Sequence, residues 1–164
     1  MTWLSKIKES PNYARLRNSL EFRYVRRQAL LIGIPCGIIL LLAILVGAVG
    51  GDLSARGAFT FAMGLVFLLP MSAYYIYRLV SLFFSIDRYI FTEVLLDRPH
   101  MGGRYGAYFT VTVRDRSGRE LQRDTSCMFG SMHEPCFDDC VNKKMLIGYN
   151  EETDRLVVIR RVGD

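Results

Sequence analysis

Two long stretches without charge constrain the fold of this chain more than any other feature. Residues Ala29–Val49 and Gly57–Tyr77 contain no Asp, Glu, Lys or Arg, and each stretch is about 20 residues long. At a rise of about 1.5 Å per residue, helices of this length match a hydrocarbon layer about 30 Å thick. The sequence therefore predicts two transmembrane helices, the second of which extends through further apolar residues to about Ile86.

A cleaved signal peptide is the alternative for the first stretch. Its apolar run is longer than the apolar part of a signal peptide, and a basic lead-in of 28 residues precedes it. A second apolar stretch follows after only a short turn. Two membrane spans therefore remain the prediction.

The basic residues predict the orientation in the membrane. Seven Lys and Arg residues against two Glu precede residue 29, whereas residues 88–164 hold twelve basic and twelve acidic residues. Positively charged flanks remain in the cytoplasm. We therefore expect a multi-pass protein of the cell inner (plasma) membrane with both termini in the cytoplasm, where disulfides are disfavoured.

The N-terminal arm, residues 1–28, carries the whole formal charge of +5. Within it, Ser10–Arg27 shows apolar residues at helical spacing, with arginines on the remaining face. This pattern is typical of a helix that lies in the headgroup layer of a membrane. It is equally typical of a basic flank that happens to be helical. In both cases we expect anionic lipids to bind its arginines, which are Arg15, Arg17, Arg23, Arg26 and Arg27.

The first apolar stretch also contains glycines at a spacing of four residues. One pair is Gly33 and Gly37, and Gly47 and Gly51 form the other. Small residues at this spacing let two helices approach closely in lipid. Packing against the second span is the simpler explanation, and self-association into a homo-oligomer is the alternative.

Residues 87–164 show the signals of a small β domain. Alternation of apolar and polar residues over Arg104–Asp115 predicts a strand, and Arg116–Gly118 predicts a hairpin turn in which the glycine adopts a positive φ. A short helix is predicted over Pro135–Asn142. The predicted strands are Tyr89–Leu96, Arg104–Asp115, Arg119–Met128, Lys144–Tyr149 and Leu156–Val162. We therefore expect an α+β membrane protein in which a two-helix hairpin precedes a five-stranded antiparallel, barrel-like domain.

Two short motifs in this domain resemble a known group of proteins. The motif D-x-x-G-R-E-L contains Asp115, Gly118, Arg119 and Glu120, and a closing G-Y-N contains Tyr149 and Asn150. Together with two spans, this layout resembles a broad group of bacterial two-span membrane proteins, and the β domain is similar in outline to the soluble domain of NfeD-type membrane proteins. Glu151 replaces the proline of that group's last turn, and the cysteine-containing insert is not part of the pattern. The resemblance implies turn chemistry and no catalytic residue.

Four metal-ligating residue types lie close together in one loop and the predicted short helix. Cys127, His133, Cys136 and Cys140 fall within fourteen residues and could supply the four ligands of a tetrahedral zinc site. Their spacing is not that of the common zinc fingers. Cysteine is also an ordinary small core residue, so inert packing and thiol chemistry are the alternatives.

The sequence contains none of the common catalytic motifs: no nucleophile elbow, phosphate-binding loop, zinc-protease helix or dinucleotide fingerprint. The zero net charge of the β domain also argues against nucleic-acid binding. We therefore expect a non-enzymatic, oligomer-forming scaffold, or a module that binds a partner through its cytoplasmic β domain.

Two further functions remain open at this stage. The first is a homo-oligomeric channel whose axis is lined by Thr60, Gly64 or Ser72 and which opens into a cytoplasmic β vestibule. Neither span has an ionisable residue in its middle, which disfavours coupled transport. The second is a metal-responsive membrane module based on the cysteine loop.

Overall fold

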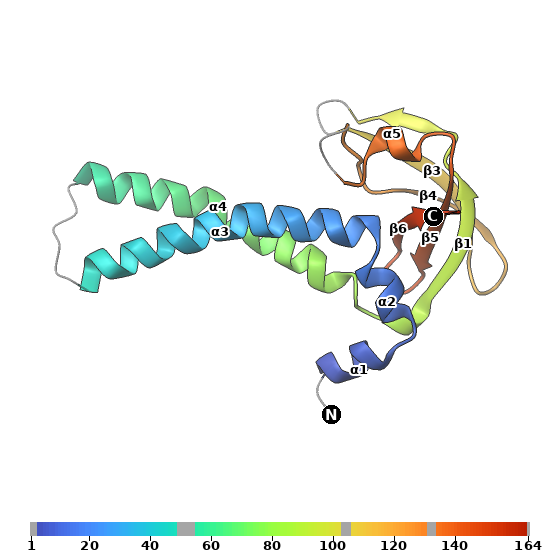
Figure 1. Cartoon of the computed structure of the whole chain (residues 1–164), viewed down its shortest axis with the longest axis horizontal. Coiled ribbons are helices and arrows are strands. Elements are labelled where there is room, and N and C mark those ends of the chain that lie inside the picture. The colour runs from blue at the N-terminus through green and yellow to red at the C-terminus, as the bar shows by residue number, and fades with distance from the viewer. Residues whose placement is uncertain (1–2, 49–54, 103–105, 131–133, 164) are drawn as a thin grey trace. The chain divides into compact units, whose positions relative to one another are not determined.

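The chain folds as two compact units, seen here in a computed structural model that describes residues 3–48, 55–102, 106–130 and 134–163 (Figure 1). Val25–Ser81 form the helical unit. Met1–Tyr24 and Leu82–Asp164 together form the second unit, which we call the globular unit. The helical unit is therefore an insertion between two segments that fold together.

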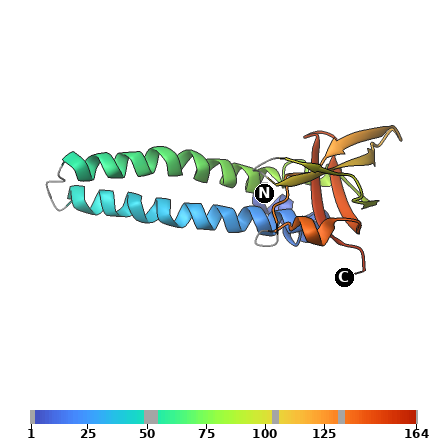
Figure 2. The same cartoon turned by 90° about the horizontal axis from the view of Figure 1, so that it is seen from above.

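The helical unit is an antiparallel pair of long helices, most of α3 (Leu20–Ala48) and all of α4 (Ala55–Ser81) (Figure 2). Both helices are long and apolar enough to cross a membrane. Large apolar side chains on them are exposed, for example Val66 and Phe67, each 63% exposed. The two predicted apolar helices are thus present. The second helix ends at Ser81 rather than continuing to Ile86, because the chain turns and Ser85 adopts a left-handed conformation with φ of 49°.

Glycines lie where the two helices approach each other. A side chain at Gly33 would meet Ser72 Oγ at 3.6 Å, and one at Gly64 would meet Ile39 Cδ1 at 3.6 Å. A side chain at Gly37, in contrast, would meet nothing within 4 Å. Gly47 lies in α3, and Gly51 lies outside the described residues. Of the predicted packing glycines, Gly33 therefore contacts the second helix and Gly37 faces open space.

Two three-stranded antiparallel sheets form the centre of the globular unit. The first has the order β1-β5-β6, from Tyr89–Leu95, Lys144–Asn150 and Arg155–Arg161. The second has the order β2-β3-β4, from Pro99–Met101, Ala107–Arg114 and Glu120–Asp124. The helices of the unit are α1 (Trp3–Glu9), α2 (Asn12–Arg17), the start of α3, the 3₁₀ helix η1 (Ile86–Arg88) and α5 (Phe137–Cys140).

The predicted hairpin around Arg116–Gly118 is confirmed, and the last two predicted strands also pair as a hairpin, but the barrel is not confirmed. β3 pairs with β4 and β5 pairs with β6, and Gly118 in the first turn has φ of +84°. Over the described residues the strands form two separate sheets and no closed barrel. The reason is visible in β6, where four consecutive residues, Leu156–Ile159, are buried. A barrel strand buries alternate residues, whereas this strand has covered faces on both sides.

Each face of the first sheet contributes to a different apolar core. One core contains Leu156 and Val158 of β6 together with Phe109 and Val111 of β3. The other core contains Val157 and Ile159, and the residues that cover them come from outside the sheet: Ile7, Leu16, Leu82 and Ile86. The N-terminal arm therefore closes the second core of the globular unit.

The prediction of one continuous helix over Ser10–Arg27 is wrong, because two helices cover this segment. α2 ends at Arg17, and α3 begins at Leu20 after a break at Asn18 and Ser19. The Ser19 hydroxyl accepts a hydrogen bond from the Phe22 amide at 3.0 Å, which is the contact that a helix N-cap makes. Two residues of the predicted lipid-facing stripe, Leu16 and Tyr24, are 0% and 5% exposed. This stripe packs on the protein itself.

Candidate functional site: the arm, its polar junction and a basic face

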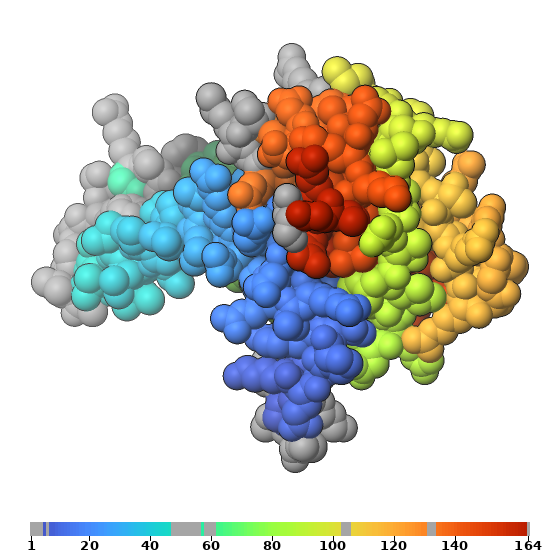
Figure 3. Space-filling view, turned by 45° about the vertical axis from the view of Figure 1, so that its right-hand side comes forward, coloured from blue at the N-terminus to red at the C-terminus, as the bar shows by residue number. Residues whose placement is uncertain are grey.

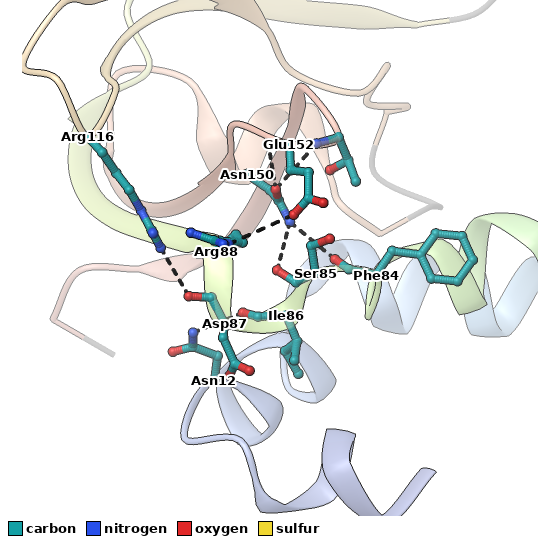
Figure 4. A network of polar contacts seen from close by, with 10 residues as sticks. Asn12, Phe84, Ser85, Ile86, Asp87, Arg88, Arg116, Asn150 and Glu152 are labelled. Carbon is teal, nitrogen blue, oxygen red and sulfur yellow. Dashed lines mark hydrogen bonds and ion pairs between the residues drawn. The ribbon is translucent and has the colours of Figure 1, made fainter. Parts of the chain in front are cut away.

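Asn150, at the end of β5, ties the exit of the helical hairpin to the sheet (Figure 4). Its Nδ2 donates hydrogen bonds to the carbonyl oxygens of Phe84 at 3.2 Å and Ser85 at 3.1 Å. Its Oδ1 accepts one from the Glu152 amide at 3.0 Å. The Asn150 side chain is fully buried. One asparagine thus fixes both the turn after α4 and the turn after β5.

The arm and the β3–β4 turn meet the same segment. Asn12 Nδ2 donates to the Ile86 carbonyl at 3.0 Å, and Ser10 Oγ donates to Asp87 Oδ1 at 2.5 Å. From the other side, the Arg116 guanidinium donates to the Asp87 carbonyl at 3.2 Å (Figure 4). Residues 84–88 are therefore held by groups from the arm and from both hairpin turns, a region that we call the polar junction.

An ion pair between a buried carboxylate and a partly buried arginine joins the first turn of α3 to β6. Glu21 is 1% exposed, and its Oε1 lies 3.3 Å from Arg155 Nη2 and accepts a hydrogen bond from Ser126 Oγ at 3.0 Å. Nearby, Tyr89 donates its hydroxyl hydrogen to the Leu82 carbonyl at 3.1 Å. Burial raises the pKa of Tyr89 to about 12; the Glu21 charge acts in the same direction and the Arg155 charge opposes it. A buried charge pair of this kind is costly to break, because it leaves one charge uncompensated.

The motifs that resemble the bacterial group fix turns. Asp115 accepts hydrogen bonds from Ser117 Oγ at 2.6 Å and from the Arg119 amide at 2.8 Å. These bonds lower the pKa of Asp115 to about 2, and the Ser117 bond has the larger effect. In the β5–β6 hairpin, Asp154 Oδ1 accepts a hydrogen bond from Tyr149 Oη at 2.8 Å and another from Arg123 Nε of β4 at 2.6 Å. The expected turn chemistry is therefore present in both places.

Two cavities in the globular unit share one arginine. The larger, about 480 Å³, lies between α2 and the first sheet and is lined by Arg15, Asn18, Glu93 and Arg160, with Phe91 and Ile159 among its apolar residues. The smaller, about 320 Å³, is lined by Arg23, Lys143, Arg160, Arg161, Glu134 and Asp139, with Leu20 and Met145 also present. In Figure 3 the red C-terminal segment lies beside the dark blue arm on this side of the unit. We call the residues around the two cavities the basic face.

The predicted lipid-binding arginines lie in three different places in the structure. Arg15 and Arg23 line the two cavities, and the Arg15 guanidinium carbon lies 5.0 Å from the centroid of the Phe91 ring. Arg17 is exposed and lies over the Tyr13 ring at 5.9 Å. Arg26 and Arg27 are exposed on the part of α3 that belongs to the helical unit.

Sequence reasoning did not identify the basic residues that join them. Arg160 and Arg161 end the last strand, and Lys143 precedes β5. Their position more than 100 residues from the arm leaves no local signal. The one available signal was the pair of arginines that ends a valine-rich strand.

The cysteine loop is only partly described. Cys127 is exposed, Cys136 and Cys140 are buried, and His133 lies outside the described residues. Cys140 belongs to the core between the sheets, and burial raises the pKa of its thiol to about 11. Within the described ranges, no group of three or more His, Cys, Asp or Glu side chains is placed to hold a metal ion. The zinc site stays a prediction, because one of its four residues is not described.

Comparisons with protein-family models, with curated proteins and with solved structures give no match to this chain.

Proposed function

We propose that this protein is a two-pass membrane protein whose globular unit acts on the cytoplasmic side by binding and assembly rather than by catalysis. The single observation that carries the proposal is the composition of the second core. Leu16, which precedes the helical hairpin, and Leu82, which follows it, are both 0% exposed and belong to one cluster. A hairpin that leaves and re-enters one folded unit has both of its ends on the same side of a membrane.

The exposed apolar surface of the hairpin supports the membrane location. Between Arg26 and Val80, the side chains that the structure describes are exposed or partly exposed, except those of Cys36 and Ser72. A surface this apolar needs lipid or another apolar partner. The excess of basic residues before the first span supports the cytoplasmic side for the globular unit.

The polar contacts support a binding role over a catalytic one. Asn150, Asp87 and Glu21 each have partners that fix a turn or join two segments. These contacts make the arm, the exit of α4 and the β5–β6 hairpin one rigid platform. Such a platform is suited to present a binding surface.

Gly37 supports assembly of several copies through the helical unit. Gly33 contacts the second helix, but a side chain at Gly37 would meet nothing within 4 Å, so that face is open to a helix of another copy. The channel alternative is less well supported. Ser72 is 8% exposed and lies next to Gly33 inside the hairpin, and Gly64 lies next to Ile39; the side chain of Thr60 is not described.

The experiment is a mass measurement by light scattering in detergent for the wild-type chain, Gly37→Ile and a control, Ala73→Ile. Both substitutions enlarge a small exposed position of the hairpin, one on each helix. We expect an oligomer for the wild type and Ala73→Ile, and smaller particles for Gly37→Ile. A wild-type monomer at every protein concentration, or equal dissociation of both variants, would contradict assembly through Gly37.

A further inference from the structure

The two cavities of the basic face are neighbours, because Arg160 lines both of them. Volumes of about 480 and 320 Å³ lie within the usual range for small-molecule sites. Their walls come from both ends of the sequence: Arg15 and Arg23 from the arm, and Arg160 and Arg161 from β6.

The charge of this face is positive, whereas the β domain as a whole is neutral. Five basic side chains line the two cavities against three carboxylates; the basic ones are Arg15, Arg23, Lys143, Arg160 and Arg161, and the acidic ones are Glu93, Glu134 and Asp139. Residues 88–164 hold equal numbers of both signs. The excess of positive charge arises because the arm places its arginines on the face where the two arginines at the end of β6 lie.

The carboxylate that pairs with Arg23 is not a strong competitor for an anion. Arg23 Nε lies 3.6 Å from Glu134 Oε2, and the two side chains are 49% and 47% exposed. Exposed ion pairs of this kind contribute about 0–1 kcal/mol. A phosphate, which accepts two parallel hydrogen bonds from one guanidinium, can therefore replace the carboxylate.

The apolar residues in the cavities indicate what the anion is attached to. Phe91, Leu146 and Ile159 line the larger cavity, and Leu20 and Met145 line the smaller one. A free inorganic ion would leave these residues in contact with water, whereas an amphiphile would cover them. The combination of arginines with an apolar lining fits a phosphate group that carries an apolar tail.

We propose that the basic face binds the phosphate headgroup of an anionic membrane phospholipid, with Arg160 and Arg161 as principal ligands and Arg15 and Arg23 as ligands from the arm. A ligand held by both segments binds only when the arm is docked on the sheet. It therefore stabilises the docked arm by mass action. The assignment of the phosphate to a lipid rests on the proposed membrane location. The binding of a phosphate group by these arginines does not depend on that location.

The test uses the full chain in an uncharged detergent and three probes: short-chain phosphatidylglycerol, short-chain phosphatidylcholine and inorganic phosphate. We expect saturable binding of phosphatidylglycerol and at least about tenfold weaker binding of the other two probes. Arg160→Gln/Arg161→Gln should weaken phosphatidylglycerol binding at least about tenfold, as expected for lost hydrogen bonds to a charged group. Arg15→Gln, on an exposed residue of the arm, should also weaken it and serves as a second variant should the double variant fold poorly.

The matched control is Arg114→Gln/Arg119→Gln, which removes the same charge from the β3–β4 hairpin, where both arginines are exposed. Equal weakening in this control, or binding that does not saturate, would overturn the site. Inorganic phosphate binding as tightly as the lipid would overturn the lipid source and assign the site to a soluble anion. Because binding is measured in detergent, each of these failures is distinguishable from a failure of the membrane topology.

Discussion

Replacing Leu16 by alanine tests whether the arm is part of the globular unit. Leu16 is 0% exposed and lies in one core with Leu82, Ile86 and Val157. Truncating a fully buried leucine costs about 2–5 kcal/mol, because the lost transfer free energy and the cavity both contribute. The matched control is Leu95→Ala in the same unit, where the leucine is 47% exposed. For the control we expect a loss below about 1 kcal/mol, in the range of surface substitutions.

Hydrogen exchange of β5 and β6, measured by mass spectrometry on the full chain in detergent, gives the answer locally. A loss of 2–5 kcal/mol in the free energy of opening should speed exchange in these strands by about 30-fold to several thousand-fold, at 1.4 kcal/mol per factor of ten. If the arm lay in the headgroup layer, away from the sheet, Leu16→Ala would leave the exchange of β6 unchanged. An effect of Leu16→Ala no larger than that of Leu95→Ala would show that the arm is not part of the core of the globular unit.

Three further predictions concern the buried polar groups and the cysteines. Arg155→Ala, which leaves a buried carboxylate without its cation, should destabilise the globular unit by about 3–5 kcal/mol in urea unfolding, whereas Arg114→Ala, from an exposed ion pair, should cost less than about 1 kcal/mol. Because the pKa of Tyr89 is raised from 10.0 to about 12, the unfolded chain loses this proton first as the pH rises. Stability should therefore fall by up to about 1.4 kcal/mol per pH unit between pH 10 and 12, and Tyr89→Phe should remove this part of the fall. In the native chain at pH 8, a thiol reagent should modify the exposed Cys127 and leave Cys140 protected until the chain unfolds. A chelator should not alter the free energy of unfolding. About one zinc per chain by elemental analysis, with stability lost on chelation, would favour the metal site instead.

Local patterns predicted the parts of the fold that local physics determines. The two apolar helices follow from uncharged stretches of membrane length, and the β3–β4 turn follows from Gly118, which supplies the positive φ of the hairpin. The core position of Cys140 agrees with the packing alternative of the sequence analysis, although His133 is not described. The end of α4 was placed too late, because apolar residues continue past the turn at Ser85.

Long-range contacts account for what the sequence did not predict. An apolar stripe that contains Leu16 and Tyr24 can be buried equally well by lipid or by a sheet, and the sequence does not say which surface is nearby. The break at Ser19 has a capping residue as its only local sign. The barrel was expected because closure removes exposed strand edges. In the structure the sheets do not close, and the arm covers one face of the first sheet. The basic face arises only when the arm and β6 meet, so Arg160 gave no signal by itself.

The most direct test of the central claim is the labelling of single cysteines by an impermeant thiol reagent in intact cells. One cysteine at a time is introduced at Lys8 in α1, at Ser117 in the β3–β4 turn, both exposed, or at Ser54 between the two apolar helices. The background is Cys127→Ser, in which the three remaining native cysteines, Cys36, Cys136 and Cys140, are buried. We expect the cysteines at Lys8 and Ser117 to be protected until the cells are opened, and the cysteine at Ser54 to react at once. Labelling of the cysteines at positions 8 and 117 from opposite sides of the membrane would contradict this expectation, because the arm and the β domain could not then form one folded unit.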